Sequence, residues 1–442
     1  MNIVLFLFIT AFFSITLGEF GQYPFGQTSF SVSIMDILLA LCLSLLLIWN
    51  IAIKKNLSLP RNFVFMILFW AIAILSLFIS LDLSGWLYLI RFILYSSTLY
   101  ITYHLVKSKI LGQSEFLTLL KITSVVLGSV GLIQLIIYPD LEILSVLGYD
   151  PHKNRIFSTF LDPNLLGTFL NFGLVIIIYD LISKPISNLL DFVKTNKLNL
   201  FAAAILLTSV TLTFSRSAYL MLVISLFIIL AVKSRKLLAF FAGLVLILYL
   251  IFPAFNNRID GAINIDDSAK ERFLSWDKGL IIFQQNPALG VGFNNIRNYS
   301  QKEDLIKLFS PDGGNSGSGI DSSLIFVLAT TGLIGFITYV IFLIRNIIDL
   351  TASLTSNLKE LYNLELRPIK FLTKVIEIPG FGRWYRESSQ TSMKFTKLSL
   401  PLLALSLGLI AGSFFINSLF FPPIMIAWFS FLGVFLALQE LE

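Results

Sequence analysis

Apolar stretches recur along most of the chain, and they constrain its fold more than any other feature. Many run for about 20 residues, which is enough to cross the hydrocarbon core of a bilayer as a helix with its backbone polar groups satisfied internally. Hydrophobic residues make up 56% of the sequence and charged residues only 13%, whereas soluble domains carry roughly 25% charged residues. The chain is therefore expected to be an all-α polytopic membrane protein.

Twelve transmembrane spans are predicted from these stretches. The first should be retained as a helix, because residues 1–18 have neither the basic n-region nor the small-residue cleavage site of a signal peptide. The predicted spans cover residues 2–18, 32–53, 62–82, 86–106, 118–138, 164–182, 199–213, 217–232, 237–253, 321–345, 398–416 and 421–438.

The distribution of Lys and Arg predicts the orientation of these spans. Spans two, four, six, eight and ten are each followed by a basic segment, and cytoplasmic loops carry such an excess of Lys and Arg. Both termini are thus expected in the cytoplasm, and the net charge of +6 does not require a nucleic-acid partner. The basic residues after spans two, four, six and eight are Lys54, Lys55, Arg61, Lys107, Lys109, Lys184, Lys194, Lys197, Lys233, Arg235 and Lys236.

Three regions follow from this topology. Residues 1–253 hold the first nine spans, and residues 254–320 form one large extracytoplasmic loop, which ends in the flexible stretch "PDGGNSGSG". Residues 321–442 hold the last three spans and a basic cytoplasmic loop at about 346–397, which is expected to lie on anionic headgroups.

The large outer loop is predicted to contain a helix. Ser268 and Glu271 fit a capping box at its start, and Asn-Pro at 286–287 should end it. Arg272 and Trp276 recur at helical spacing and should share one face.

The stretch "NRIFSTFLDPNLLG", residues 154–167, combines polar groups at the predicted outer edge of a span. Asp162 is a suitable N-cap and Pro163 a suitable first residue for the helix that follows. Capping does not account for Arg155, because arginine is disfavoured on the outer side. Arg155 either extends toward headgroups or binds an anion.

The stretch "TFSRSAYL", residues 213–220, joins two spans by a very short turn. Ser215 and its neighbours are ordinary capping residues. Arg216 lies between two apolar helices, where a charge is costly unless it faces water or an anion.

The glycines of "NPALGVGFNN", Gly290 and Gly292, permit a tight turn or a close approach of two backbones. They are no nucleotide motif, because no strand precedes them and a third glycine is missing. The basic residues earlier in this loop either pair with neighbouring acids on a solvated helix or bind an anion, and Arg272 is the preferred candidate because of Trp276. These basic residues are Arg258, Lys270, Arg272 and Lys278.

Asp321 lies where the tenth span begins, in "GIDSSLIFVLATTGLIG". It is either the N-cap of that span, with Ser322 and Ser323 beside it, or a carboxylate at the membrane surface that accepts a proton from a hydroxyl.

Metal and cofactor chemistry is not indicated. Cys42 is the one cysteine, so no internal disulfide or thiolate metal site is possible, and no carboxylate or His/Cys cluster suggests a metal.

Arginine binds phosphate in bidentate fashion and keeps its charge. Three arginines and a carboxylate on one side of the membrane therefore suit a substrate with a lipid tail and a diphosphate head, with arginine in the electrostatic role that Mg²⁺ has elsewhere.

Four motifs, "RIFSTFLDPNLLG", "TFSRSAYL", "NPALGVGFNNI" and "DSSLIFVLATTGLIG", occur in the order seen in the O-antigen ligase and O-antigen polymerase superfamily. The resemblance covers roughly residues 155–345. It implies a polytopic GT-C glycosyltransferase of the bacterial inner membrane that acts at the outer face without metal or cofactor. Its substrates would be an undecaprenyl diphosphate-linked oligosaccharide and a glycan or lipid acceptor, and a chain-length regulator or a flippase would be a possible partner.

The resemblance also implies roles for individual residues. Arg155, Arg216 and Arg272 match the diphosphate-binding positions, and Asp321 falls where ligases carry a catalytic histidine. His152, Asn164, Ser215 and Trp276 are candidate supporting residues. Because Asp321 departs from the ligase pattern, a polysaccharide polymerase is favoured over an O-antigen ligase or a protein O-oligosaccharyltransferase.

A transporter or lipid-linked glycan flippase is the alternative of another class. Such a protein should carry ionisable residues near the bilayer midplane, in related halves of the chain. Arg91 and Lys121 are the basic residues near or inside spans, and the two halves show no similarity.

Overall fold

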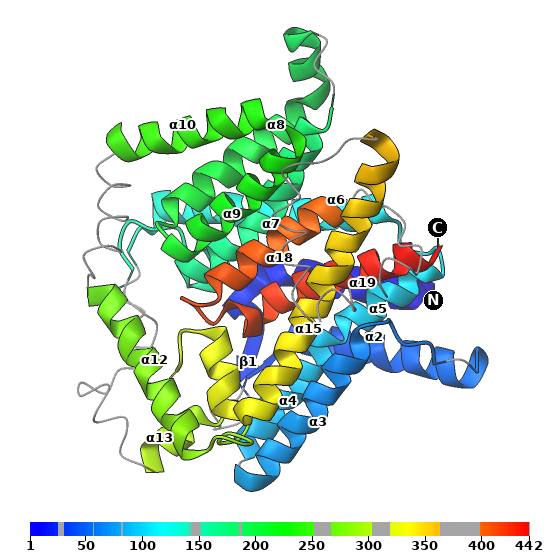
Figure 1. The fold of residues 1–442 in the computed structure, drawn as a ribbon, viewed down its shortest axis with the longest axis vertical. Coiled ribbons are helices and arrows are strands. Elements are labelled where there is room, and N and C mark those ends of the chain that lie inside the picture. The colour runs from blue at the N-terminus through cyan, green and yellow to red at the C-terminus, as the bar shows by residue number, and fades with distance from the viewer. Residues whose placement is uncertain are drawn as a thin grey trace.

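The computed structural model describes residues 1–24, 31–55, 57–80, 83–140, 142, 152–184, 188–251, 267–302, 319–362 and 398–441, which form a helical bundle (Figure 1). The α-helices are α1 Asn2–Phe13, α2 Ile34–Ile48, α3 Phe63–Ser80, α4 Leu83–Ser96, α5 Thr98–Lys107, α6 Gln113–Ile137, α7 Pro163–Ile182, α8 Leu189–Leu212, α9 Arg216–Lys233, α10 Arg235–Ile251, α12 Asp267–Gln285, α13 Ile296–Lys302, α15 Ser323–Tyr362, α18 Ser399–Gly412 and α19 Pro422–Leu441. Shorter helical segments are η1 Ser14–Gly21, η2 Trp49–Ile53, η4 Ser158–Phe160 and η7 Ser418–Phe420.

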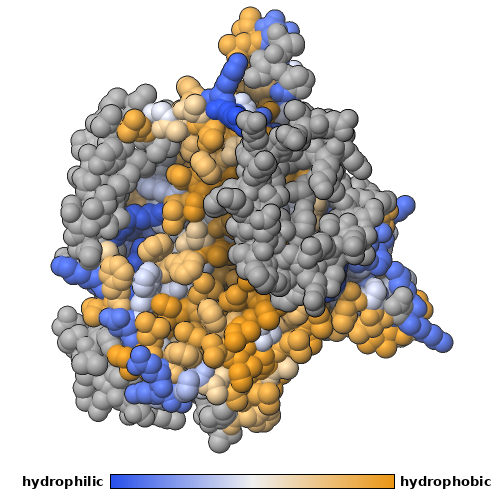
Figure 2. All heavy atoms as spheres, viewed as in Figure 1, coloured by the Kyte–Doolittle hydropathy of each residue, from blue (hydrophilic) through white to orange (hydrophobic). Residues whose placement is uncertain are grey.

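Every predicted span overlaps a helix among the described residues, because these stretches are apolar enough to be buried or to face lipid. Among the described residues, eight helical segments are long and apolar enough to cross a membrane, and α3 and α18 are shorter apolar helices. The chain is thus a polytopic, essentially all-helical membrane protein, and the count of twelve crossings stays a prediction. Hydrophobic side chains cover much of the visible face, and hydrophilic ones gather at its edges (Figure 2).

Several predicted bounds were wrong. The seventh span was expected at 199–213, but α8 already begins at Leu189, capped by Asn188, and deviates from helical geometry at Asn196. The fourth span is divided into α4 and α5 at Ser97, within a run of hydroxyl side chains that bond back to the preceding turn. The tenth continues as α15 to Tyr362, into the segment assigned to a cytoplasmic loop.

The outer-loop helix α12 is present and ends at Gln285, as predicted from Asn-Pro at 286–287. It begins at Asp267, so Ser268 lies within the helix and is not its N-cap. An acidic residue in the first turn complements the helix dipole. Arg258 and the "PDGGNSGSG" stretch up to residue 318 lie outside the described residues, as does the chain from 363 to 397.

A two-stranded antiparallel sheet, β1 Gln22–Pro24 with β2 Ser31–Ser33, is an addition to the all-α expectation. Ser33 ends β2 and forms a capping box with Asp36 at the start of α2. Asp36 also accepts hydrogen bonds from Arg91 of α4 at 2.6 and 3.0 Å. The predicted intramembrane arginine is therefore neutralised by a carboxylate.

Helix α15 breaks at Gly332, whose φ of 65° belongs to the left-handed region that favours glycine. The break opens backbone groups of α15 to the loop behind α12. Val291 and Gly292 donate to Ala329 O and Thr330 O, both at 3.1 Å, and Leu333 donates to Pro287 O at 2.8 Å. We call the paired segments 286–293 and 329–334 the glycine junction.

The glycine junction leaves no room for a Cβ atom. At Gly290 it would lie 2.4 Å from Thr330 C, and at Gly332 it would lie 2.3 Å from Ala288 O. Ser76 of α3 closes the junction, because its Oγ lies 2.6 Å from Leu289 O and 2.7 Å from Thr330 O. The close backbone approach expected of Gly290 is confirmed, and its partner is α15.

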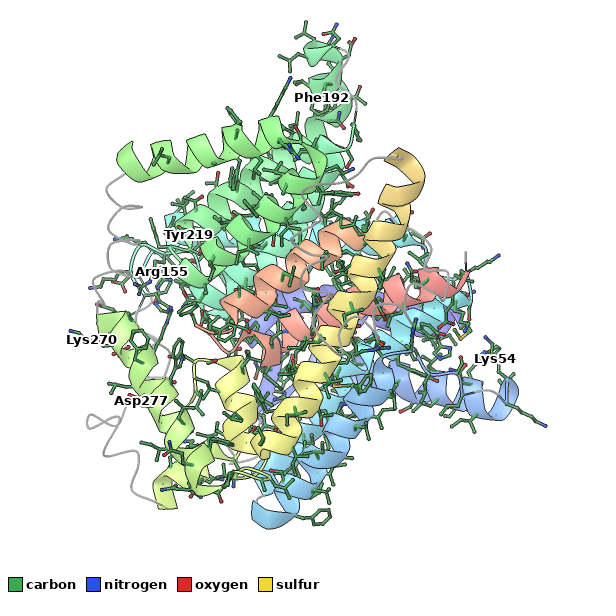
Figure 3. The ribbon with its side chains drawn as sticks, viewed as in Figure 1. Lys54, Arg155, Phe192, Tyr219, Lys270 and Asp277 are labelled. Atoms are coloured by element: carbon green, nitrogen blue, oxygen red, sulfur yellow. The ribbon has the colours of Figure 1, made fainter. Side chains whose placement is uncertain are left out.

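The two ends of the bundle differ in what they carry. Both chain termini lie together at one end (Figure 1), and Lys54 lies on that side (Figure 3). Arg155, Lys270 and Asp277 lie at the opposite end, with α12 (Figure 3). The sidedness of these ends in the membrane stays a prediction from charge.

Candidate active site

Arg155 is oriented against the turn between α8 and α9. Its Nε donates to Thr213 O at 2.8 Å, and one terminal nitrogen donates to Asn164 Oδ1 at 3.3 Å. The other terminal nitrogen lies 3.5 Å from His152 Nδ1. The structure thus brings together three predicted site residues, Arg155, Asn164 and His152.

Asp162 is the N-cap of α7 and Pro163 is its first residue, as predicted. The Oδ1 atom of Asp162 accepts from the backbone of Asn164 at 2.6 Å and of Leu165 at 3.0 Å. Burial raises the pKa of Asp162, and the backbone hydrogen bonds from Leu165 and Asn164 act against that rise, followed by the positive charges of Arg155 and Arg272. Arg272 on α12 therefore lies close enough to the start of α7 to act on the same carboxylate as Arg155.

Arg216 is the first residue of α9, and its side chain is half-buried. Ser215 caps this helix, with Oγ accepting from Ala218 N at 3.3 Å. Phe214 adopts a left-handed φ of 48°, which lets the chain reverse within a few residues. This turn holds Arg216 beside Thr213, the residue that binds Arg155.

Helix α12 presents Arg272, Ser275 and Trp276 on one face, since positions i, i+3 and i+4 are neighbours on a helix. Arg272 and Trp276 are half-buried. Ser275 Oγ accepts a hydrogen bond from Asp321 N at 2.8 Å. Ser275 is a candidate site residue that sequence reasoning missed, because one serine in a polar helix gives no signal.

Asp321 is not the N-cap of α15. That role falls to Ser322, whose Oγ accepts from Ile325 N at 3.4 Å, and α15 begins at Ser323. Of the two readings of Asp321, the capping one is wrong, and the reading as a reactive carboxylate stays a prediction.

The turn at residues 412–416, at the end of α18 and before η7, contacts α9, α12 and the start of α15. Gly412 packs on the start of α9, where an added Cβ would lie 3.2 Å from Ser217 O. Ser413 O accepts from Ser323 N at 2.9 Å. Phe415 packs on Trp276, with ring centroids 5.7 Å apart.

The 412–416 turn thus lies beside Arg216 on α9, Asp321 before α15 and Trp276 on α12, and in Figure 1 it extends toward α12. Its sequence, "GSFFI", has no charged residue, so it gave no functional signal.

Lys278 is buried, whereas one of the two readings of the sequence placed it on the solvated face of a helix. Its side chain is only 1% exposed, whereas its neighbour Asp277 is exposed. Burial lowers the pKa of Lys278 to about 8. Among the described residues, no three His, Cys, Asp or Glu side chains are grouped so as to hold a metal ion.

Comparison with known protein families matches residues 201–340 to the O-antigen ligase family, Wzy_C. The match contains Arg216, Arg272 and Asp321, and it leaves Arg155 and the 412–416 turn outside. No curated protein matches the chain. Residues 201–340 therefore form an O-antigen ligase family domain, and the chain is a membrane glycosyltransferase of the O-antigen ligase/polymerase type.

Proposed function

We propose that this glycosyltransferase moves a glycan from an undecaprenyl diphosphate carrier to an acceptor hydroxyl at the outer face of the bacterial inner membrane, and that it is a polysaccharide polymerase. The observation that supports the proposal is a chain of contacts between the elements that carry the candidate residues: Arg155 binds the α8–α9 turn next to Arg216, and Asp321 binds Ser275 on α12, which carries Arg272. The 412–416 turn contacts both α9 and α12.

The arginines are suited to the leaving group. As the bond between the anomeric carbon and the phosphate oxygen breaks, negative charge grows on the diphosphate. Groups fixed in advance around that position stabilise the transition state more than the ground state. Arg216 and Arg272 would carry most of this task, and Arg155 would assist from the α7 side.

The acceptor hydroxyl would attack the anomeric carbon from the face opposite the diphosphate, which inverts its configuration. Its oxygen forms the new glycosidic bond and its proton passes to Asp321, while the diphosphate departs with the lipid. A carboxylate held within reach of the hydroxyl can contribute about 10²- to 10⁴-fold as a general base.

Transport is a weaker proposal because of two ion pairs. Arg91 pairs with Asp36, and Lys121 on α6 pairs with Asp180 on α7. A charge inside a span that is neutralised by a neighbouring helix is well suited to hold helices together.

The test is to incubate the purified protein in nanodiscs with an undecaprenyl diphosphate-linked oligosaccharide from its host and to separate the lipid-linked products on a gel. A ladder of longer glycans, absent in Arg216→Ala and present with a chelator, is the expected result. Consumption of donor only after a second acceptor is added would instead identify a ligase or a protein O-oligosaccharyltransferase. Movement of intact donor across the bilayer without transfer would overturn the proposal in favour of transport.

A further inference from the structure

Trp276 and the turn after α18 form an aromatic surface next to the charged residues. Trp276 packs on Phe415 at 5.7 Å and on Phe273 at 5.3 Å. Phe415 and Phe273 are still 37% and 43% exposed. Part of this aromatic surface therefore remains open to a ligand.

Polar atoms with unused hydrogen-bonding capacity accompany these rings. Trp276 Nε1 is buried and has no acceptor among the described residues. Asn417 Oδ1 and Ser418 Oγ, which directly follow the 412–416 turn, are also buried and lack partners in the described part of the chain. Buried polar groups are normally paired, so their hydrogen bonds are expected to be made to a ligand or to water.

Charge divides this end of the molecule into two halves. The charge of Arg272 acts on Asp162, which caps the start of α7. Trp276, one helical turn further along α12, lies toward residues 412–421, which contain no Lys, Arg, Asp or Glu. A diphosphate fits the first half, whereas the second half fits an uncharged ligand.

We infer that Trp276, Phe415 and Asn417 form a subsite for a neutral sugar ring next to the reacting carbon. This inference rests on the proposed function and extends it. A pyranose has an apolar face of C–H groups, which packs on an aromatic ring, and a rim of hydroxyls, which suits an indole N–H and an amide oxygen. Asp321 lies beside this subsite, because its backbone is bound to Ser275, the neighbour of Trp276.

A prenyl tail would match the exposed rings but not the polar atoms. Trp276 Nε1 and Asn417 Oδ1 are already buried without partners, and a hydrocarbon would leave them so, at a standing cost of roughly 1–3 kcal/mol each. A sugar offers partners to both and is therefore the better occupant.

The experiment uses the full chain in nanodiscs and the free, lipid-less oligosaccharide of the donor as probe. Saturation-transfer NMR should show contact with the sugar ring in the wild type, a loss of that contact in Trp276→Ala, and partial recovery in Trp276→Phe. Phe240→Ala on α10, where Phe240 is 71% exposed, is the control and should keep the signal. Asn417→Ala should weaken the signal if Trp276→Ala does not fold.

Kinetics identify which glycan occupies the subsite. In Trp276→Ala the KM should rise by up to about tenfold, with a smaller change in kcat. A rise for the acceptor marks an acceptor subsite, and a rise for the donor marks a donor subsite. Both results support the inference.

Two results would overturn it. One is an unchanged sugar signal in both Trp276→Ala and Asn417→Ala. The other is an equal loss, in these variants, of binding to undecaprenyl phosphate, which carries no sugar, because that would assign the surface to the lipid tail. If the sugar signal depends on Trp276 but no transfer occurs with any acceptor, the proposed function fails while the subsite stands.

Discussion

The helix α12 and the loop directly behind it contribute to the molecule in opposite ways. On helix α12, the charge of Arg272 acts on Asp162 before α7, Ser275 binds the backbone of Asp321 before α15, and Trp276 packs on Phe415 of the 412–416 turn. The loop at 286–293 has no charged side chain, and its backbone is hydrogen-bonded to the segment of α15 around the break at Gly332.

Three of the four sequence motifs are therefore divided between two tasks. "TFSRSAYL" and the Asp321 end of "DSSLIFVLATTGLIG" supply charged groups, whereas "NPALGVGFNNI" and the Gly332 end of the same motif hold two backbones together. Changes in the glycine junction should remove folded protein, and changes in the charged cluster should remove activity from folded protein.

Gly332→Ala should have the largest effect. The new Cβ would lie 2.3 Å from Ala288 O, at a φ of 65° that disfavours alanine. Strain and overlap together should cost about 3 kcal/mol or more, so little monodisperse protein should be recovered on size-exclusion chromatography. Gly243→Ala is the control, because a Cβ there meets nothing within 4 Å. Normal yield and melting of Gly332→Ala would contradict a rigid junction.

Asp321 and its neighbour Ser322 should show opposite defects. Asp321→Asn removes the proposed base and should lower kcat by about 10²- to 10⁴-fold with an unchanged melting temperature. Ser322→Ala removes the N-cap of α15 and should lower the free energy of unfolding by about 1 kcal/mol with kcat retained. Single-turnover assays and thermal unfolding in detergent measure both. A full kcat in Asp321→Asn would exclude it as the base.

Arg216→Lys should lower kcat/KM by about 10²-fold, because lysine keeps the charge but loses the planar fork that binds a diphosphate. Thermal unfolding should change little. Arg235→Lys, at the exposed start of α10, is the matched control and should leave kcat/KM unchanged. Wild-type turnover by Arg216→Lys on the native donor would show that charge alone suffices at this position.

Much of the fold could be predicted from local sequence. A long apolar stretch forms a helix in lipid whatever its neighbours are, so each predicted span overlaps a helix among the described residues. The start of α7 at Asp162 and Pro163 could be predicted equally well, because a cap depends on residues within one turn.

The remainder depends on partners far apart in the chain. The break at Gly332 is stabilised by backbone hydrogen bonds to Pro287 and Gly292, and the sequence shows neither this contact nor its geometry. Ser275 and the 412–416 turn have ordinary compositions and enter the site through packing alone. The charged candidate residues could be predicted from sequence, because a lone arginine at the edge of a span is costly without a function.

Ser76→Ala should have the smallest effect, and it tests what holds the junction together. Ser76 is fully buried and its Oγ lies 2.6 Å from Leu289 O and 2.7 Å from Thr330 O. A hydroxyl has one hydrogen and donates to one carbonyl at a time, so its loss should cost about 1 kcal/mol and leave turnover per folded molecule unchanged. Thr338→Ala, whose hydroxyl donates to Ile334 O of its own helix, is the control for thermal unfolding. If Ser76→Ala were as damaging as Gly332→Ala, one side chain from α3 would hold the junction. The smaller loss expected here would assign that role to the backbone bonds between its two segments.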